Sequence, residues 1–255
     1  LELLDEKRVD GIVRGGMRTI TIAPEAGTER LRRVIRKTMT HQDILNSGRT
    51  LAAKGVQKLK LYFMMGLPTE SDEDMEGIVS LARDLKRVFA EVGHHPRLSL
   101  SVSPLVPKPW TAFQWKAMIS KEVHERRAKI LLRALDRISG VRVTVGTPKE
   151  TYRQSILSLG DRRVSEALIR WAEGTSPTWK RALRDAHVDV EWLLYAEKPD
   201  EYRFPWDFVK TAVSRRYLLK EYHRSFRDGE ELGAKAWEER QRELAERETA
   251  TRASA

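Results

Sequence analysis

Apolar and polar side chains alternate through the segment KLKLYFMMG, residues 58–66. In an extended chain the two leucines and Phe63 share one face, and Lys58, Lys60 and Tyr62 share the other, because successive side chains of a strand point to opposite sides. The segment therefore predicts a strand with one buried face and one polar face.

The same pattern recurs about 40 residues before and after this segment. The segments RTITIAPE, residues 18–25, and RLSLSVSP, residues 97–104, also alternate, and their polar positions are threonines and serines. Helix starts lie between them, because Thr28 can cap a helix and the pairs Thr40–Asp43 and Ser71–Asp74 resemble capping boxes. Strands separated by capped helices predict right-handed parallel βα units, and hence an α/β fold.

The polar face of these strands predicts more than the topology. Parallel strands that are buried on both faces usually read as continuous apolar runs, and a closed eight-stranded barrel fills its interior with branched apolar side chains. Alternation instead favours an open barrel or curved sheet whose polar face can hold a ligand. An antiparallel sheet with one solvated face is the alternative, which the capped helices between the strands disfavour.

The rest of the chain differs in character. A short strand is expected at VRVTV, residues 141–145, and the following region is mostly helical and is interrupted by prolines. We therefore divide the chain into a partial barrel over 1–146, a helical region over 147–229 and a charged tail over 230–255, which is expected to be helical or disordered.

Composition excludes several classes of protein. The 255 residues include no cysteine, so the chain has no disulfide, no cysteine-ligated metal and no thiol nucleophile. The six histidines show no metal-ligand spacing, and no metal-binding residues are predicted. No run of residues is long and apolar enough to span a membrane, and no signal peptide opens the chain, so we expect a cytoplasmic protein without a membrane partner.

The net charge of +10 is unevenly distributed. Residues 230–255 include seven Glu and five Lys or Arg, a net charge of −2, so the preceding residues carry a net charge of +12. This excess favours an anionic partner such as phosphate, nucleotide or RNA, with a soluble basic surface as the alternative.

Three runs in order resemble the radical S-adenosylmethionine (SAM) enzymes: TITIAPEAGTERLRRVIRK at 19–37, KLKLYFMMGLPTESDEDMEGI at 58–78 and LSLSVSPLVPKPWTAFQW at 98–115. The nearest likeness is to a largely uncharacterised group that often carries a cobalamin-binding domain. The resemblance implies the C-terminal half, about three βα units, of an open (β/α)6 radical SAM partial barrel followed by a mostly α-helical region. The loop with cysteines in CxxxCxxC spacing would lie upstream of Leu1, so we expect a C-terminal fragment.

The resemblance also implies an activity. Radical SAM enzymes cleave SAM reductively at a [4Fe–4S] cluster to give a 5′-deoxyadenosyl radical, and radical methyl transfer would follow if cobalamin belongs to the complete protein. The implied partners are the missing N-terminal half of the barrel, a reductant such as ferredoxin or flavodoxin, and a small-molecule or RNA substrate. An RNA-modifying radical SAM enzyme and a non-catalytic basic scaffold module remain alternatives, the latter because the cluster cysteines are absent.

The resemblance assigns residues at the strand ends and on the polar face, but no catalytic residue. Glu25 would contact the ribose or amino-acid part of SAM, and the remaining candidates for cofactor binding are Lys60, Tyr62, Gly66, Leu67, Pro68, Ser101, Val102, Ser103 and Pro104. The substrate candidates are Thr21, Ser99, Lys108 and Trp110. Glu70 is interpreted as a charge at a helix N-terminus, and the basic run 30–37 as a solvated face.

Overall fold

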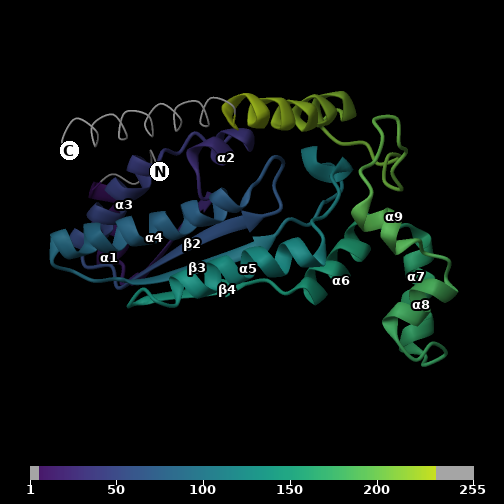
Figure 1. Ribbon diagram of the computed structural model, residues 1–255, viewed down its shortest axis with the longest axis horizontal. Coiled ribbons are helices and arrows are strands. Elements are labelled where there is room, and N and C mark those ends of the chain that lie inside the picture. Colours follow the sequence, from purple (N-terminus) through teal and green to yellow (C-terminus); the bar gives the residue numbers. More distant parts are fainter. Residues whose placement is uncertain (1–5, 234–255) are drawn as a thin grey trace, which may run out of the picture.

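The computed structural model describes residues 6–233. Its centre is a parallel sheet of four strands in the order β1-β2-β3-β4, which are β1 (Thr19–Glu25), β2 (Lys58–Met65), β3 (Arg97–Pro104) and β4 (Val141–Val145) (Figure 1). The predicted α/β fold of parallel βα units followed by helices is confirmed. The three alternating segments are neighbours in the sheet, and the short fourth strand joins them by pairing with β3.

Helices cover one face of this sheet. They are α1 (Glu6–Arg14), α3 (His41–Ala53), α4 (Asp72–Val92) and α5 (Lys121–Leu135), and their apolar side chains form one core with the strands (Figure 1). Leu59, Leu61 and Phe63 are each at most 1% exposed within this core. The opposite face of the sheet carries the polar side chains, as the alternation predicts.

The predicted helix starts are present. The short helix α2 (Glu29–Val34) is capped by Thr28, whose hydroxyl accepts the N–H of Leu31 at 3.2 Å. The capping box of Thr40 and Asp43 opens α3. At the start of α4 the backbone N–H of Ser71 donates to Asp74 at 2.8 Å. These caps satisfy backbone donors that have no partner inside the helix.

The chain after the sheet is mostly helical. It contains α6 (Pro148–Leu159), α7 (Arg162–Ala172), α8 (Trp179–Asp185) and α9 (Val190–Tyr195), and the 3-10 helix η1 (Ala112–Trp115) precedes α5. A further helix, residues 215–233, returns to the sheet domain and lies against α2, where Arg36 and Glu221 form two hydrogen bonds of 2.8 Å (Figure 1). This helix continues through 230–233, and residues 234–255 of the expected tail lie outside the described residues.

Within residues 6–233, no helix combines the length and the apolar character that crossing a lipid bilayer requires.

Candidate functional site

The open face of the sheet brings several predicted residues into adjacent rows. Thr21, Lys60 and Ser99 are register partners on β1, β2 and β3, and Tyr62 and Ser101 are partners one row further along. The rows are about 7 Å apart, because a strand rises about 3.3 Å per residue. All five side chains are exposed or half-buried, so this face presents hydroxyl and ammonium groups to a ligand.

Glu25 lies at the carboxyl end of β1 in an unusual backbone conformation. The pairing of β1 with β2 shifts register between Ile22 and Glu25, which is a bulge that contains Pro24. Glu25 has a φ of 67°, a region that costs a non-glycine residue roughly 1 kcal/mol or more. Its carboxylate lies 3.5 Å from Lys37 Nζ, which also donates to the Ala23 carbonyl at 3.0 Å. Because of the bulge, Glu25 pairs with Phe63 of β2 and does not continue the register of Thr19 and Thr21.

The loop after β2 is more buried than the resemblance suggests. Gly66, Leu67 and Pro68 are all buried, and Leu67 packs with Ala26 and neighbouring residues of α2. Gly66 has a φ of +96°, and a Cβ on it would lie 3.2 Å from Ile119. The glycine is therefore required by its own backbone conformation and packing, and only backbone groups of this loop could meet a ligand.

The other strand-end candidates divide between the two faces. Val102 is 1% exposed in the core beneath the sheet, and Pro104 is also buried. Ser103 is exposed on the open side. The side chain of Val102 therefore packs against helices, and Ser103 alone of these three presents its side chain to solvent.

Two substrate candidates lie in the segment that follows β3. Lys108 is exposed. Trp110 packs with the aromatic cluster of Trp115 and Phe204, and its backbone N–H donates to Gln114 Oε1 at 3.0 Å. Trp110 therefore contributes to the aromatic packing between the segment after β3 and the helical region.

The sequence interpretation missed the role of Glu70. Its side chain is 1% exposed and pairs with Arg127 of α5, which also donates to the Glu70 carbonyl at 2.7 Å. The same carboxylate accepts the Gly66 N–H at 2.5 Å. Burial raises the pKa of Glu70 to about 7, and the attraction of Arg127 offsets this only in part. Glu70 thus links the loop after β2 to α5. The local sequence around Glu70 does not predict this link, because its partner Arg127 lies 57 residues later in the chain.

The raised pKa of Glu70 predicts that stability falls as pH rises. Its pKa in the fold is about 7 against an ordinary 4.5, so between these values the folded chain binds a proton that the unfolded chain has lost. The stabilisation is complete below about pH 4.5 and is lost as pH rises through about 7, a change of about 1–3 kcal/mol. Urea denaturation at pH 5, 6, 7 and 8 measures it. The same measurement on Glu70→Gln gives the pH dependence of all other groups, and subtracting it leaves the contribution of Glu70. If this difference in the free energy of unfolding is flat or rises with pH, the prediction is contradicted.

The basic run 30–37 is a solvated face only in part, because the side chains of Arg33 and Arg36 are exposed whereas that of Arg32 is buried. Arg32 is fully buried and donates to the carbonyls of Ala26 at 2.9 Å and Met39 at 2.8 Å. Arg30 pairs with Asp74 at 2.5 Å, and Arg36 pairs with Glu221. These cations fasten α2 to its neighbours, because a buried charge is tolerated only with partners.

Residues 6–233 contain no metal centre of their own. The chain contains no cysteine, and residues 6–233 hold no group of three or more His, Asp or Glu side chains that could bind a metal ion. Iron–sulfur clusters are held by cysteine thiolates, so the residues of this chain do not fit a [4Fe–4S] cluster.

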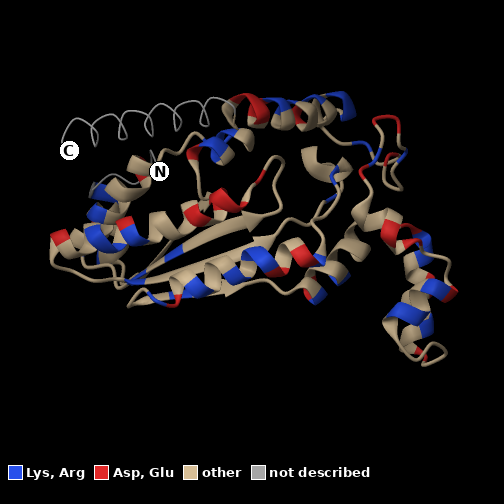
Figure 2. Cartoon of the chain, viewed as in Figure 1, with Lys and Arg blue, Asp and Glu red and all other residues tan. Residues whose placement is uncertain are grey.

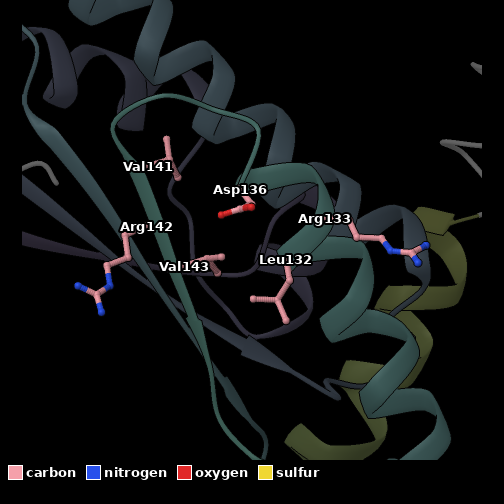
Figure 3. A pocket seen from close by; sticks show the side chains of 6 residues that line it. All are labelled: Leu132, Arg133, Asp136, Val141, Arg142 and Val143. Carbon is pink, nitrogen blue, oxygen red and sulfur yellow. The ribbon is translucent and has the colours of Figure 1, made fainter.

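A hollow of about 550 Å³ lies between α5 and β4 (Figure 3). Leu132, Asp136 and Val143 point toward it, whereas Arg133 and Arg142 point away, Arg142 toward the open face (Figure 3). Because only one polar side chain converges on this hollow, it offers little for recognition of a ligand.

Comparison with known proteins finds similarity in the part of the chain that forms the sheet. Residues 2–82 match the model of the Radical SAM superfamily, a segment that contains β1, β2 and the loops with Glu25 and Gly66. The chain is 38% identical over 151 residues to "Uncharacterized protein MJ0966" of Methanocaldococcus jannaschii. This alignment covers 59% of the chain and 32% of the relative, so the chain spans about a third of the length of the relative that it matches. The first third of the chain, with two of the four strands, is thus similar to the Radical SAM superfamily.

Proposed function

We propose that this chain forms the C-terminal part of a radical SAM enzyme, in which the open face and the carboxyl edge of the sheet hold SAM beside a substrate. The observation that supports this most is the polar open face of a parallel sheet whose first two strands lie in the segment similar to the Radical SAM superfamily. In parallel βα folds, ligands bind at the carboxyl ends of the strands.

The residues of the site suit the parts of SAM. The Glu25 carboxylate can accept hydrogen bonds from ribose hydroxyls or from the ammonium group of the methionine part. We assign the adenine to backbone groups of the buried loop 66–68, and Tyr62, Ser101 and Ser103 offer hydroxyls along the face. Thr21, Lys60 and Ser99 form the next row, where we place a substrate group.

The radical chemistry belongs to the cofactor. The [4Fe–4S] cluster would be held by cysteines outside this chain and would receive an electron from a ferredoxin or flavodoxin. In this proposal the chain itself binds SAM, orients it toward the substrate and lines the space around both. Methyl transfer with cobalamin is a further expectation that rests on family resemblance alone.

The test uses the complete gene product, purified and reconstituted with iron and sulfide without oxygen. We expect an iron–sulfur signal in electron paramagnetic resonance, and formation of 5′-deoxyadenosine when SAM and dithionite are added. Glu25→Gln keeps the size of the side chain but removes its charge, so the KM for SAM is expected to rise about tenfold, as loss of a charge-assisted hydrogen bond would produce.

A matched variant controls for the loss of a carboxylate. Glu125→Gln changes an exposed glutamate on α5 whose one ion pair within residues 6–233 is with Lys121, and its KM for SAM should equal that of the unmodified protein. A complete gene product that binds no cluster and forms no 5′-deoxyadenosine would overturn the proposed function. An unchanged KM for Glu25→Gln would remove Glu25 from the site.

A further inference from the structure

Cationic side chains gather at the opposite, amino-terminal edge of the sheet. A pocket of about 410 Å³ lies there and is lined by Arg18, Lys58 and Arg97 together with His94 and His95. Figure 2 shows Lys and Arg in blue at the starts of β2 and β3. The proposed SAM site extends from the other end of these eight-residue strands back to Tyr62, which is four residues, about 13 Å, from Lys58.

The sheet register brings these cations together. Lys58 and Arg97 are partners across β2 and β3, so their backbones lie about 4.8 Å apart. The Arg18 carbonyl accepts the Lys58 N–H at 3.0 Å, which places Arg18 at the start of the neighbouring strand. His94 Nε2 donates to the Val56 carbonyl at 2.9 Å, which fixes its imidazole at the rim. Three consecutive strand starts thus present one charged group each.

These charges are not compensated within the described part of the chain. No Asp or Glu lines the pocket, and Arg18, Lys58 and Arg97 form no ion pair with any described residue. The contrast with the run 30–37 is informative, since Arg30, Arg36 and Lys37 each have a carboxylate partner. Clustered unpaired cations repel one another in the folded protein, and an anionic ligand would relieve this repulsion.

The same charge continues onto the open face. Lys60 and Arg142 lie one row further along, on either side of Ser99, and neither is paired with a described carboxylate. The amino-terminal half of the face therefore carries positive charge, whereas its carboxyl half carries the hydroxyls of Tyr62 and Ser101.

The side chains of the pocket indicate the class of ligand. Arginine presents a planar fork that binds phosphate through two hydrogen bonds, and lysine adds a point charge. No Phe, Tyr or Trp lines the pocket, whereas single-stranded RNA is usually bound by aromatic side chains on which its bases stack. We propose that this pocket binds a small molecule through one or more phosphate groups, at a site separate from the one proposed for SAM.

Binding of inorganic pyrophosphate to the 255-residue chain, followed by calorimetry, tests this inference. We expect a saturable site in 50 mM salt that weakens at 200 mM salt, because partly exposed charges are screened. Lys58→Ala and Arg97→Ala should each weaken binding about tenfold. Lys129→Ala, which removes an exposed cation from α5, should leave the affinity unchanged.

A second measurement does not depend on variants. Pyrophosphate should shift the imidazole resonances of His94 and His95 in a nuclear magnetic resonance titration and leave those of His223, outside the pocket, in place. The inference is overturned if Lys58→Ala and Arg97→Ala bind pyrophosphate as the unmodified chain does. It is also overturned in favour of RNA if a ten-nucleotide polyuridine binds more tightly than pyrophosphate and loses affinity in the same variants.

Discussion

Arg127→Met is expected to lower the free energy of unfolding by about 3 kcal/mol at pH 8. The Arg127 side chain is only 7% exposed, and it contacts the carboxylate of Glu70, the carbonyl of Glu70 at 2.7 Å and the carboxylate of Asp72 at 3.2 Å. Methionine fills similar volume but leaves Glu70, 1% exposed, without its cation. An unpaired buried charge is far more costly than an exposed pair that is lost.

The neighbouring arginine provides a matched control. Arg126 also pairs with Asp72, at 2.9 Å, but is 56% exposed, so Arg126→Met should cost less than about 1 kcal/mol in urea denaturation at the same pH. The double variant Arg127→Met with Glu70→Gln should recover part of the loss, because no charge is then left unpaired. Equal losses for Arg126→Met and Arg127→Met would contradict this account of the buried pair.

The Glu70–Arg127 pair also connects packing to the proposed site. The carboxylate of Glu70 holds the backbone of Gly66, and Arg127 holds Glu70 from α5. The loop that we assign to adenine is therefore positioned by a helix that begins more than 50 residues later in the sequence. A site built in this way depends on α5 as much as on the strand that precedes the loop.

Local features of the fold could be predicted from the sequence because their causes are local. Alternation within eight residues predicts the buried and open faces of β2, and a capping box spans four residues, as with Thr40 and Asp43. The open face with Lys60, Tyr62 and Ser101 follows directly from that alternation.

Features that depend on distant partners could not be predicted in this way. The sequence of the run 30–37 predicts a charged helix face, but Arg30 forms an ion pair with Asp74 and Arg36 forms one with Glu221, both far along the chain. The bulge at Pro24 shifts the register of Glu25, and the alternating pattern before it gives no sign of this shift. Burial of Leu67 likewise depends on α2 folding back over the strand end.

Gly27→Ala is expected to destabilise the fold by about 3 kcal/mol or more, the upper end of what overpacking usually costs. A Cβ at Gly27 would lie 2.2 Å from the Asp74 carbonyl oxygen and 2.6 Å from the Ile78 nitrogen. Both are backbone atoms of the first turns of α4, so relief requires moving the helix itself. The contact is equally close from the side of α4, because a Cβ added to Gly77 would lie 3.0 Å from the Gly27 carbonyl carbon.

Two other glycines calibrate the measurement by thermal and urea unfolding. At Gly48 an added Cβ would lie 2.5 Å from a terminal carbon of the Leu85 side chain, which can move, so Gly48→Ala should cost less than Gly27→Ala. At Gly11, within α1, nothing lies within 4 Å, and Gly11→Ala should stabilise the chain by up to about 1 kcal/mol. A loss at Gly27 no larger than that at Gly48 would show that α4 can shift, and that its contact with the loop after β1 is not the rigid backbone packing inferred from Gly27 and Gly77.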